Sequence, residues 1–409
     1  MGLDLTEFTA SATELDDADP LGDHPSRFLR HDDPSIGAYL DGNSLGRPLQ
    51  ATADRLARFV ADEWAGRLIR GWDERWFDLP LTLGDRLGDV VLGAAPGQTT
   101  IGDSTTVLLY KLARGALTLR PGRTEIVLDR DNFPTDRYLI ESIAHDLGLT
   151  LRWIDADFAG GVTTDDLAAA VTDDTALVVL SHVAYRSGYL LDAPAIIDLI
   201  HDAGALLLLD LCHSAGSVEI ELDSWAVDFA VGCTYKYLNG GPGSPAFAYV
   251  ASRHLEDFTQ PIWGWMGRDT PFEMAQGYVP APGIRRVLSG TPAIIGMLPM
   301  ADTLDLLDEV GMAAVRAKSL ALSEFALEMV DEWLLPHGVE VSSPRDPERR
   351  GGHVTIDHPT FKEVTARLWT RGIIPDFRRP DGIRLGLSPL STTFGEVVVG
   401  LAAIRSELG

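Results

Sequence analysis

The sequence predicts an α/β protein built on a mostly parallel sheet with helices on both faces. Between residues 124 and 250, short apolar runs alternate with amphipathic stretches, the pattern of repeated strand–helix units. The runs end in polar or turn residues, as buried parallel strands do. With 409 residues and 45% hydrophobic content, the chain can bury a large core, and we expect two domains.

Taken in order, the chain begins with a polar, turn-rich segment, 1–50, with a short strand near its end. Helices are expected at 51–64, 81–92 and from Ser104 onward. The strands expected next are 124–128, 151–154, 176–183, 205–209, 228–233 and 246–250, and the helices between them are 136–147, 164–171 and 193–203. After an irregular aromatic stretch, the expected helices are 294–307, 311–333 and 361–370. These patterns predict an N-terminal segment (1–50) associated with the small domain, a large domain (51–300) and a small α+β domain (301–409).

Composition excludes several classes of partner. The net charge of −26 argues against nucleic acid or an anionic membrane as the main partner. Apolar runs are too short to span a bilayer, and the acidic N-terminus lacks the pattern of a secretion signal. Two cysteines, Cys212 and Cys233, fit a reducing, cytoplasmic compartment. The histidine and cysteine spacings match no metal site.

A lysine and an aspartate at the ends of two neighbouring apolar runs suggest a cofactor. Asp210 ends the first run, and Lys236 follows the second beside a glycine-rich loop. In pyridoxal phosphate enzymes a lysine holds the cofactor aldehyde as a Schiff base, and an aspartate keeps the pyridine nitrogen protonated. A capping or turn role for Asp210 and a solvated loop position for Lys236 are the alternatives.

Two further segments have both a functional and a structural explanation. Ser104, Thr105 and Thr106 open a helix, where hydroxyls and free N–H groups bind phosphate or simply cap the helix. The tryptophan-rich segment 71–80 forms either a packed aromatic cluster or the wall of a pocket for a flat substrate.

Together these segments resemble the kynureninase family, fold-type I pyridoxal phosphate enzymes of the class V aminotransferase superfamily. The resemblance spans nearly the whole chain and rests on these stretches, in order: LDGNSLG, RGWDERWFDLP, NFPTDRY, YRSG, DLCHSAG, TYKYLNGGPGSP, GWMG, SGTP and IRLGLSPL. It implies a seven-stranded sheet and a homodimer with a shared active site. The implied reaction cleaves the Cβ–Cγ bond of kynurenine, or a ring-substituted kynurenine, to an anthranilate and L-alanine through a ketimine.

The resemblance also implies residue roles. Lys236 carries the cofactor, Asp210 pairs with its ring nitrogen, and Tyr235 contacts phosphate and assists proton transfer. Arg384 binds the substrate carboxylate, with Asn43 and Trp72 in the substrate site. The remaining implied cofactor residues are Thr105, Thr106, Phe133, Asp136, Ser181, His213, Trp265 and Thr291.

Four positions depart from the family pattern: Leu108 and Ala184 where asparagine is usual, Arg268 where histidine is usual, and Cys212 where alanine is usual. They leave the identity of the substrate open. Another class V reaction, such as transamination or epimerisation, and a non-catalytic cofactor-binding homologue also stay open.

Overall fold

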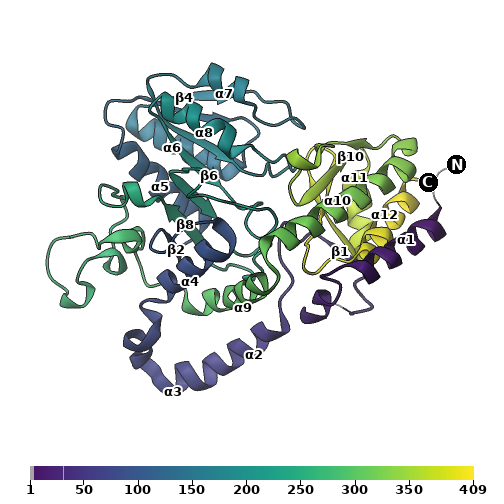
Figure 1. Cartoon of the computed structure of the whole chain (residues 1–409), viewed down its shortest axis with the longest axis horizontal. Coiled ribbons are helices and arrows are strands. Elements are labelled where there is room, and N and C mark those ends of the chain that lie inside the picture. Colours follow the sequence, from purple (N-terminus) through teal and green to yellow (C-terminus); the bar gives the residue numbers. More distant parts are fainter. Residues whose placement is uncertain (1–3, 31) are drawn as a thin grey trace.

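The computed structural model describes residues 4–30 and 32–409, which form two separate sheets flanked by helices (Figure 1). Residues 1–3 and 31 of the expected N-terminal segment lie outside the described residues. The larger sheet has seven strands, in the order β2-β8-β7-β6-β5-β3-β4. Its strands are β2 (Thr99–Gly102), β3 (Glu125–Asp129), β4 (Thr150–Ile154), β5 (Thr175–Ser181), β6 (Leu206–Asp210), β7 (Phe229–Gly232) and β8 (Ala246–Val250). Only β8 runs antiparallel to its neighbours, so the predicted mostly parallel sheet is confirmed.

Both faces of this sheet are buried, which explains its continuous apolar runs. Along β6, Leu206 and Leu208 point into one core, whereas Leu207 and Leu209 point into another. The first core is covered by α5 (Thr105–Thr118) and α6 (Pro134–Leu147). The second is covered by α4 (Leu79–Leu87), α7 (Thr164–Ala170), α8 (Ala193–Asp202) and α9 (Ile294–Val310).

The smaller sheet forms the second lobe in Figure 1, with strand order β1-β11-β12-β10-β9. Its strands are β1 (Ala38–Leu40), β9 (Glu340–Val341), β10 (His353–Asp357), β11 (Ile373–Arg378) and β12 (Gly382–Gly386). The helices around it are α1 (Leu5–Ala18), α10 (Met312–Trp333), α11 (Phe361–Thr370) and α12 (Phe394–Leu408). The start of α10 packs in the large core at Val315, and its later turns pack in the small core from Leu322 onward.

An arm projects below the two lobes in Figure 1 and carries α2 (Gln50–Arg58), a π-helical stretch (Phe59–Trp64) and α3 (Ala65–Arg67). The helix predicted over 51–64 is therefore present. Of its expected apolar face, Phe59 is buried, but Val60 and Trp64 are about half exposed, at 48% and 51%.

Two elements of the structure were not predicted from the sequence. Within the polar, turn-rich segment 1–50, helix α1 occupies Leu5–Ala18, with a capping box made by Asp4 and Glu7. Strand β2 was not predicted, because its four residues, TTIG, are too few to show a periodic pattern of apolar and polar side chains. It is buried because β8 pairs with one edge and α4 packs on it. Among the described residues, no helix combines the length and apolarity needed to cross a bilayer.

Asp228, just before β7, predicts an acid-sensitive contribution to stability. Its buried carboxylate accepts hydrogen bonds from His201 Nε2 (2.9 Å), His254 Nε2 (2.7 Å), the Leu207 N–H (2.8 Å) and Arg253 (2.7 Å). Burial alone would raise the pKa of Asp228, but the hydrogen bonds outweigh burial and hold that pKa below its usual range.

We expect Asp228→Asn to lower the free energy of unfolding by about 3 kcal/mol at pH 7. Because the pKa is lowered on folding, the stabilisation is complete above the unfolded-state pKa of about 3.9 and is lost as pH falls further. Urea unfolding of both proteins from pH 7 down to pH 3 measures this, and a difference that stays constant over that range would contradict the assignment.

Candidate active site

The site lies where the carboxyl ends of parallel strands in the large sheet face the small sheet. Ser181 and Asp210, the last residues of β5 and β6, are register partners. Lys236 follows β7 in the next loop, and Arg384 comes from β12 of the small sheet. Ligands of open α/β sheets bind at the carboxyl ends of their strands, which makes this junction the candidate site.

His213 lies between Lys236 and Arg384. Its Nε2 is 3.1 Å from Lys236 Nζ and 3.4 Å from Arg384 Nη1, and all three residues are buried. Burial and the two nearby cations lower the pKa of His213 well below its usual value. The imidazole is therefore neutral, and it joins an amine on the large sheet to a guanidinium on the small sheet.

Two carboxyl groups face each other beside the lysine. Asp136, in the first turn of α6, is 2% exposed, and its Oδ2 has no hydrogen-bond partner. Burial and the adjacent Asp210 raise the pKa of Asp136 well above its usual value. Asp210 accepts a hydrogen bond from the Cys212 N–H at 2.7 Å. Two adjacent buried carboxyl groups, one of them with an unpaired oxygen, favour a ligand that places a protonated hydrogen-bond donor between them.

Arg384 is fixed by contacts that the sequence analysis did not find. Its register partner across the β11–β12 hairpin, Asp376, accepts a hydrogen bond from Nε at 2.6 Å and forms an ion pair with Nη2 at 2.5 Å. The Tyr185 carbonyl accepts from Nη1 at 2.5 Å, and Ser44 Oγ accepts from Nη2 at 3.0 Å. Together with His213, these partners engage all three nitrogens of the Arg384 guanidinium group. One sequence signal could have revealed Asp376. The short alternating strands on either side of DGIR indicate a hairpin, and in a hairpin Asp376 can lie opposite Arg384.

The loop after β1 brings Asn43 into this region. Asn43 is fully buried, and neither atom of its side-chain amide has a hydrogen-bond partner. Asp41 lies nearby, and burial followed by repulsion from Asp376 raises its pKa to about 6. A buried amide with no partner costs free energy, so a polar ligand beside Asn43 would remove that cost.

Other predicted residues surround the same loop ends. Thr105 and Thr106 begin α5, and Thr105 Oγ1 is 4.0 Å from Cys212 Sγ. Phe133 precedes α6 and packs edge-on against Tyr185, with ring centroids 5.3 Å apart.

Ser181 and Tyr235 complete this group. Ser181 donates to Asn132 Oδ1 at 2.9 Å. Tyr235 is half-buried, with its ring centroid 5.9 Å from Lys236 Nζ. Burial raises the pKa of Tyr235, so its phenol stays protonated at neutral pH.

Trp72, Trp265 and Thr291 belong to a different part of the molecule. Trp265 donates to Thr291 Oγ1 at 3.3 Å, and its ring centroid lies 6.0 Å from that of Trp72. Phe77 and Phe272 extend this aromatic cluster. None of the described contacts of these three residues reaches Lys236 or Arg384, so the structure brings the predicted site residues together in two groups.

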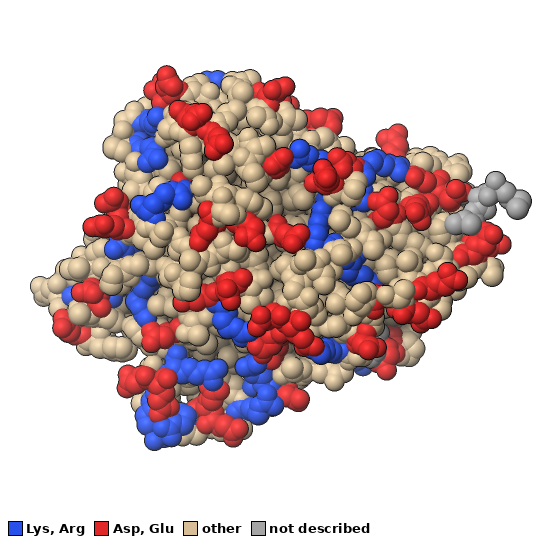
Figure 2. Space-filling model, viewed as in Figure 1, with Lys and Arg blue, Asp and Glu red and all other residues tan. Residues whose placement is uncertain are grey.

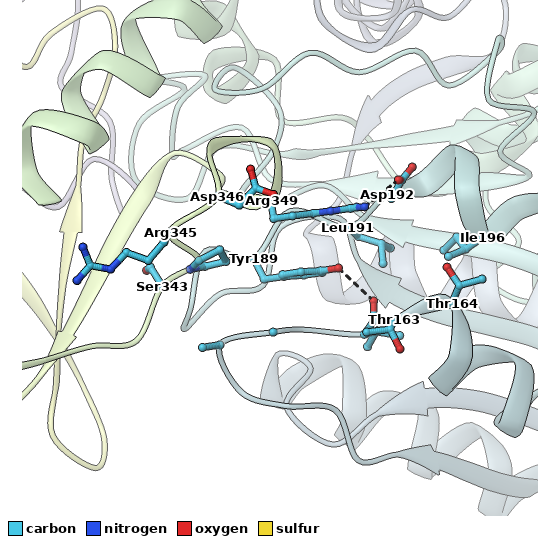
Figure 3. Close-up of a pocket in the computed structure, with 14 residues that line it drawn as sticks. Thr163, Thr164, Tyr189, Leu191, Asp192, Ile196, Ser343, Arg345, Asp346 and Arg349 are labelled. Atoms are coloured by element: carbon cyan, nitrogen blue, oxygen red, sulfur yellow. Dashed lines mark hydrogen bonds and ion pairs between the residues drawn. The ribbon is translucent and has the colours of Figure 1, made fainter.

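A cavity of about 540 Å³ lies elsewhere, between the segment 159–164, the start of α8 and residues 343–349 (Figure 3). The Tyr189 hydroxyl donates to the Val162 carbonyl, next to Thr163, at 3.4 Å, and Arg349 extends toward Asp192, with which it forms an ion pair at 3.2 Å (Figure 3). None of the residues that line this cavity is a predicted site residue.

The four departures from the family pattern occupy different environments. Leu108 is fully buried in the core under α5, and Cys212 adjoins Asp210. Ala184 lines a small cavity that also contains Ser181. Arg268 binds the Thr270 carbonyl at 2.6 Å in the irregular loop. Cys212 and Ala184 therefore contact the residues around the candidate site, whereas Leu108 fills a core position.

Comparison with solved structures identifies the class of fold. A cysteine desulfurase from Escherichia coli superposes with a TM-score of 0.80 at 16% identity, covering 95% of this chain and 98% of that one. The protein named C-DES, with glycine covalently linked to its PLP cofactor, superposes with a TM-score of 0.79 at 20% identity. The match covers 90% of this chain and 96% of that one. The fold is that of the fold-type I pyridoxal phosphate enzymes.

Comparison with curated proteins identifies the family. The kynureninase of Burkholderia pseudomallei (strain 1106a) is 40% identical over 404 residues, covering 97% of this chain and 94% of that protein. The kynureninase of Pseudomonas fluorescens is 42% identical over 367 residues, covering 88% and 86%. The model of the kynureninase C-terminal domain matches residues 315–404. The chain belongs to the kynureninase family.

Proposed function

We propose that this protein is a pyridoxal phosphate-dependent hydrolase. It cleaves the Cβ–Cγ bond of L-kynurenine, or of a ring-substituted kynurenine, to an anthranilate and L-alanine. Family membership at 40% identity over nearly the whole chain supports the reaction. The observation that carries the proposal is the convergence of Lys236, His213 and Arg384 beside two carboxyl groups.

The buried residues fit the cofactor. The unpaired Asp136 Oδ2 and the facing Asp210 suit a protonated ring nitrogen, which would relieve their mutual repulsion. In this proposal Lys236 holds the aldehyde, Phe133, which precedes α6, covers the ring, and the start of α5 binds the phosphate. When bound, the cofactor supplies an electron sink for the substrate carbon.

The chain's own residues then bind substrate and move protons. Arg384 holds the α-carboxylate, with Asn43 offering its unpaired amide. Lys236 Nζ takes the Cα proton and later returns it, and the neutral His213 holds that amine in place. Tyr235, kept protonated by burial, donates a proton as the carbon–carbon bond breaks.

We also propose a homodimer in which each subunit completes the other's site. Trp72, Trp265 and Thr291 have no described contact with Lys236 within one chain, and they would meet the partner subunit's lysine across the interface. Large apolar side chains are exposed around these residues: Val60, Trp64, Leu68, Ile69, Trp263, Phe272, Met274 and Val279. Exposed apolar surface of this extent is typical of an association surface. Sedimentation at micromolar concentration tests this, and a monomer that is fully active would contradict it.

We further propose that the protein is cytoplasmic and binds neither nucleic acid nor membrane. Its large domain would span 51–300 and its small domain 301–409, with residues 1–50 beside the small domain. The acidic character rests on the net charge of −26, and Figure 2 shows that the Asp and Glu residues on the face in view are interspersed with Lys and Arg. Cys212 and Cys233 are buried free thiols.

Product identification tests the reaction. Purified holoenzyme is incubated with kynurenine, 3-hydroxykynurenine and other ring-substituted kynurenines, and the products are separated. An anthranilate with equimolar alanine supports the proposal. A keto acid would indicate transamination, an inverted stereocentre epimerisation, and no change in any substrate a non-catalytic homologue; each of these results would overturn it.

A further inference from the structure

Lys111 is a fully buried lysine that the proposed reaction does not use. It lies on α5, and its ammonium group donates to Asp103 Oδ2 at 2.6 Å and to the Val287 carbonyl at 2.8 Å. Burying an ammonium group costs free energy unless the group is paired, so the role of a lysine at this depth follows from the groups that it binds. Its two partners come from segments more than 180 residues apart in the chain.

The first partner fixes the loop that presents the start of α5. Asp103 has a φ of 44°, in the left-handed region that side chains other than glycine rarely adopt. Its carbonyl accepts from the Ala246 N–H at 3.0 Å, and its carboxylate binds Lys111. Ser104 follows directly and caps α5. Lys111 therefore holds the backbone that orients the hydroxyls of Thr105 and Thr106.

The second partner fixes the segment that leads to Thr291. Val287 is four residues before Thr291, whose hydroxyl accepts a hydrogen bond from Trp265. Between them, the Ser289 carbonyl accepts from the Met266 N–H at 3.2 Å. Lys111 thus links two segments. One carries Thr105 and Thr106, and the other leads to Thr291, which binds Trp265.

We propose that Lys111 is a positioning residue for cofactor phosphate: from the interior of the large domain it holds the start of α5, which serves this subunit's cofactor, and the segment 287–291, which in the proposed dimer completes the partner subunit's cofactor site. This inference rests on the proposed cofactor. If Lys111 has this role, its loss weakens binding of the cofactor through the phosphate group. The loss of an ordinary core residue would instead weaken cofactor binding equally with or without the phosphate.

The test compares pyridoxal phosphate with pyridoxal, which lacks the phosphate. We expect Lys111→Met to weaken equilibrium binding of pyridoxal phosphate to the apoprotein by roughly 10- to 100-fold. Binding of pyridoxal should change by less than about twofold. Asp103→Asn removes the ion pair with Lys111 but leaves Lys111 bonded to Val287. It should likewise weaken binding of pyridoxal phosphate more than binding of pyridoxal, and it provides the test if Lys111→Met does not fold.

Lys318 offers a matched control, since it is also buried and forms an ion pair with an aspartate, Asp19, beside the small sheet. Lys318→Met should lower stability without changing the preference for pyridoxal phosphate over pyridoxal. Equal losses for both ligands in the Lys111 and Asp103 variants, or no loss in either, would overturn the inference. Failure of the wild-type protein to bind pyridoxal phosphate would instead overturn the proposed function.

Discussion

Lys236→Ala is expected to lower kcat by at least about 10⁴-fold, the largest effect of any single substitution in the protein. The amine is the only one that the described contacts place beside His213 and Arg384, and it has two tasks, holding the cofactor and moving the Cα proton. The measurement is the rate of anthranilate formation from kynurenine at saturating cofactor.

Added small amines provide the control for this variant. They replace the missing amine in solution, so partial recovery of the rate with methylamine would show that the rest of the site is intact. Turnover by Lys236→Ala at near wild-type rate without any added amine would show that another residue performs both tasks.

Arg384→Lys is expected to raise KM for kynurenine by roughly 100-fold, with a smaller effect on kcat. A lysine keeps the charge but loses the fork that allows one guanidinium to hold Asp376 and a carboxylate together. All three guanidinium nitrogens of Arg384 already have partners, and we expect a substrate carboxylate to replace the contact with Ser44 or with His213, the two longest of them.

Two companion variants make this prediction specific. Ser44→Ala removes a contact that substrate replaces, so its KM should change by less than about threefold. Asp376→Asn loosens the guanidinium while leaving Arg384 in place, and its KM should rise by about tenfold. An unchanged KM in Arg384→Lys would remove Arg384 from the substrate site.

The strands and helices of the large sheet were predictable because each is buried in a regular way. The strand predicted at 246–250 matches β8, and those at 124–128 and 151–154 match β3 and β4 to within one residue. Continuous apolar runs between polar ends leave few alternatives in a doubly covered sheet. Helix α1 was missed because its buried face is small, with only Phe8 and Ala12 in the core.

The parts of the site on the large sheet were predictable for a related reason. Asp210 and Lys236 come directly after buried runs, and the carboxyl ends of parallel strands converge. Asp376 and Ser44 were missed because their roles depend on how the small sheet meets the large one. Local patterns do not encode that contact, which joins Arg384 to Tyr185 across 199 positions of sequence.

The covalent site of the cofactor tests the account most directly. Holoenzyme is reduced with borohydride, digested and analysed by mass spectrometry to find the peptide that carries the pyridoxyl group. We expect a single modified lysine, Lys236, in the peptide that contains TYKYLNGG. A pyridoxyl group on Lys111, Lys318 or Lys362, or no modified peptide in a protein that cleaves kynurenine, would contradict the account.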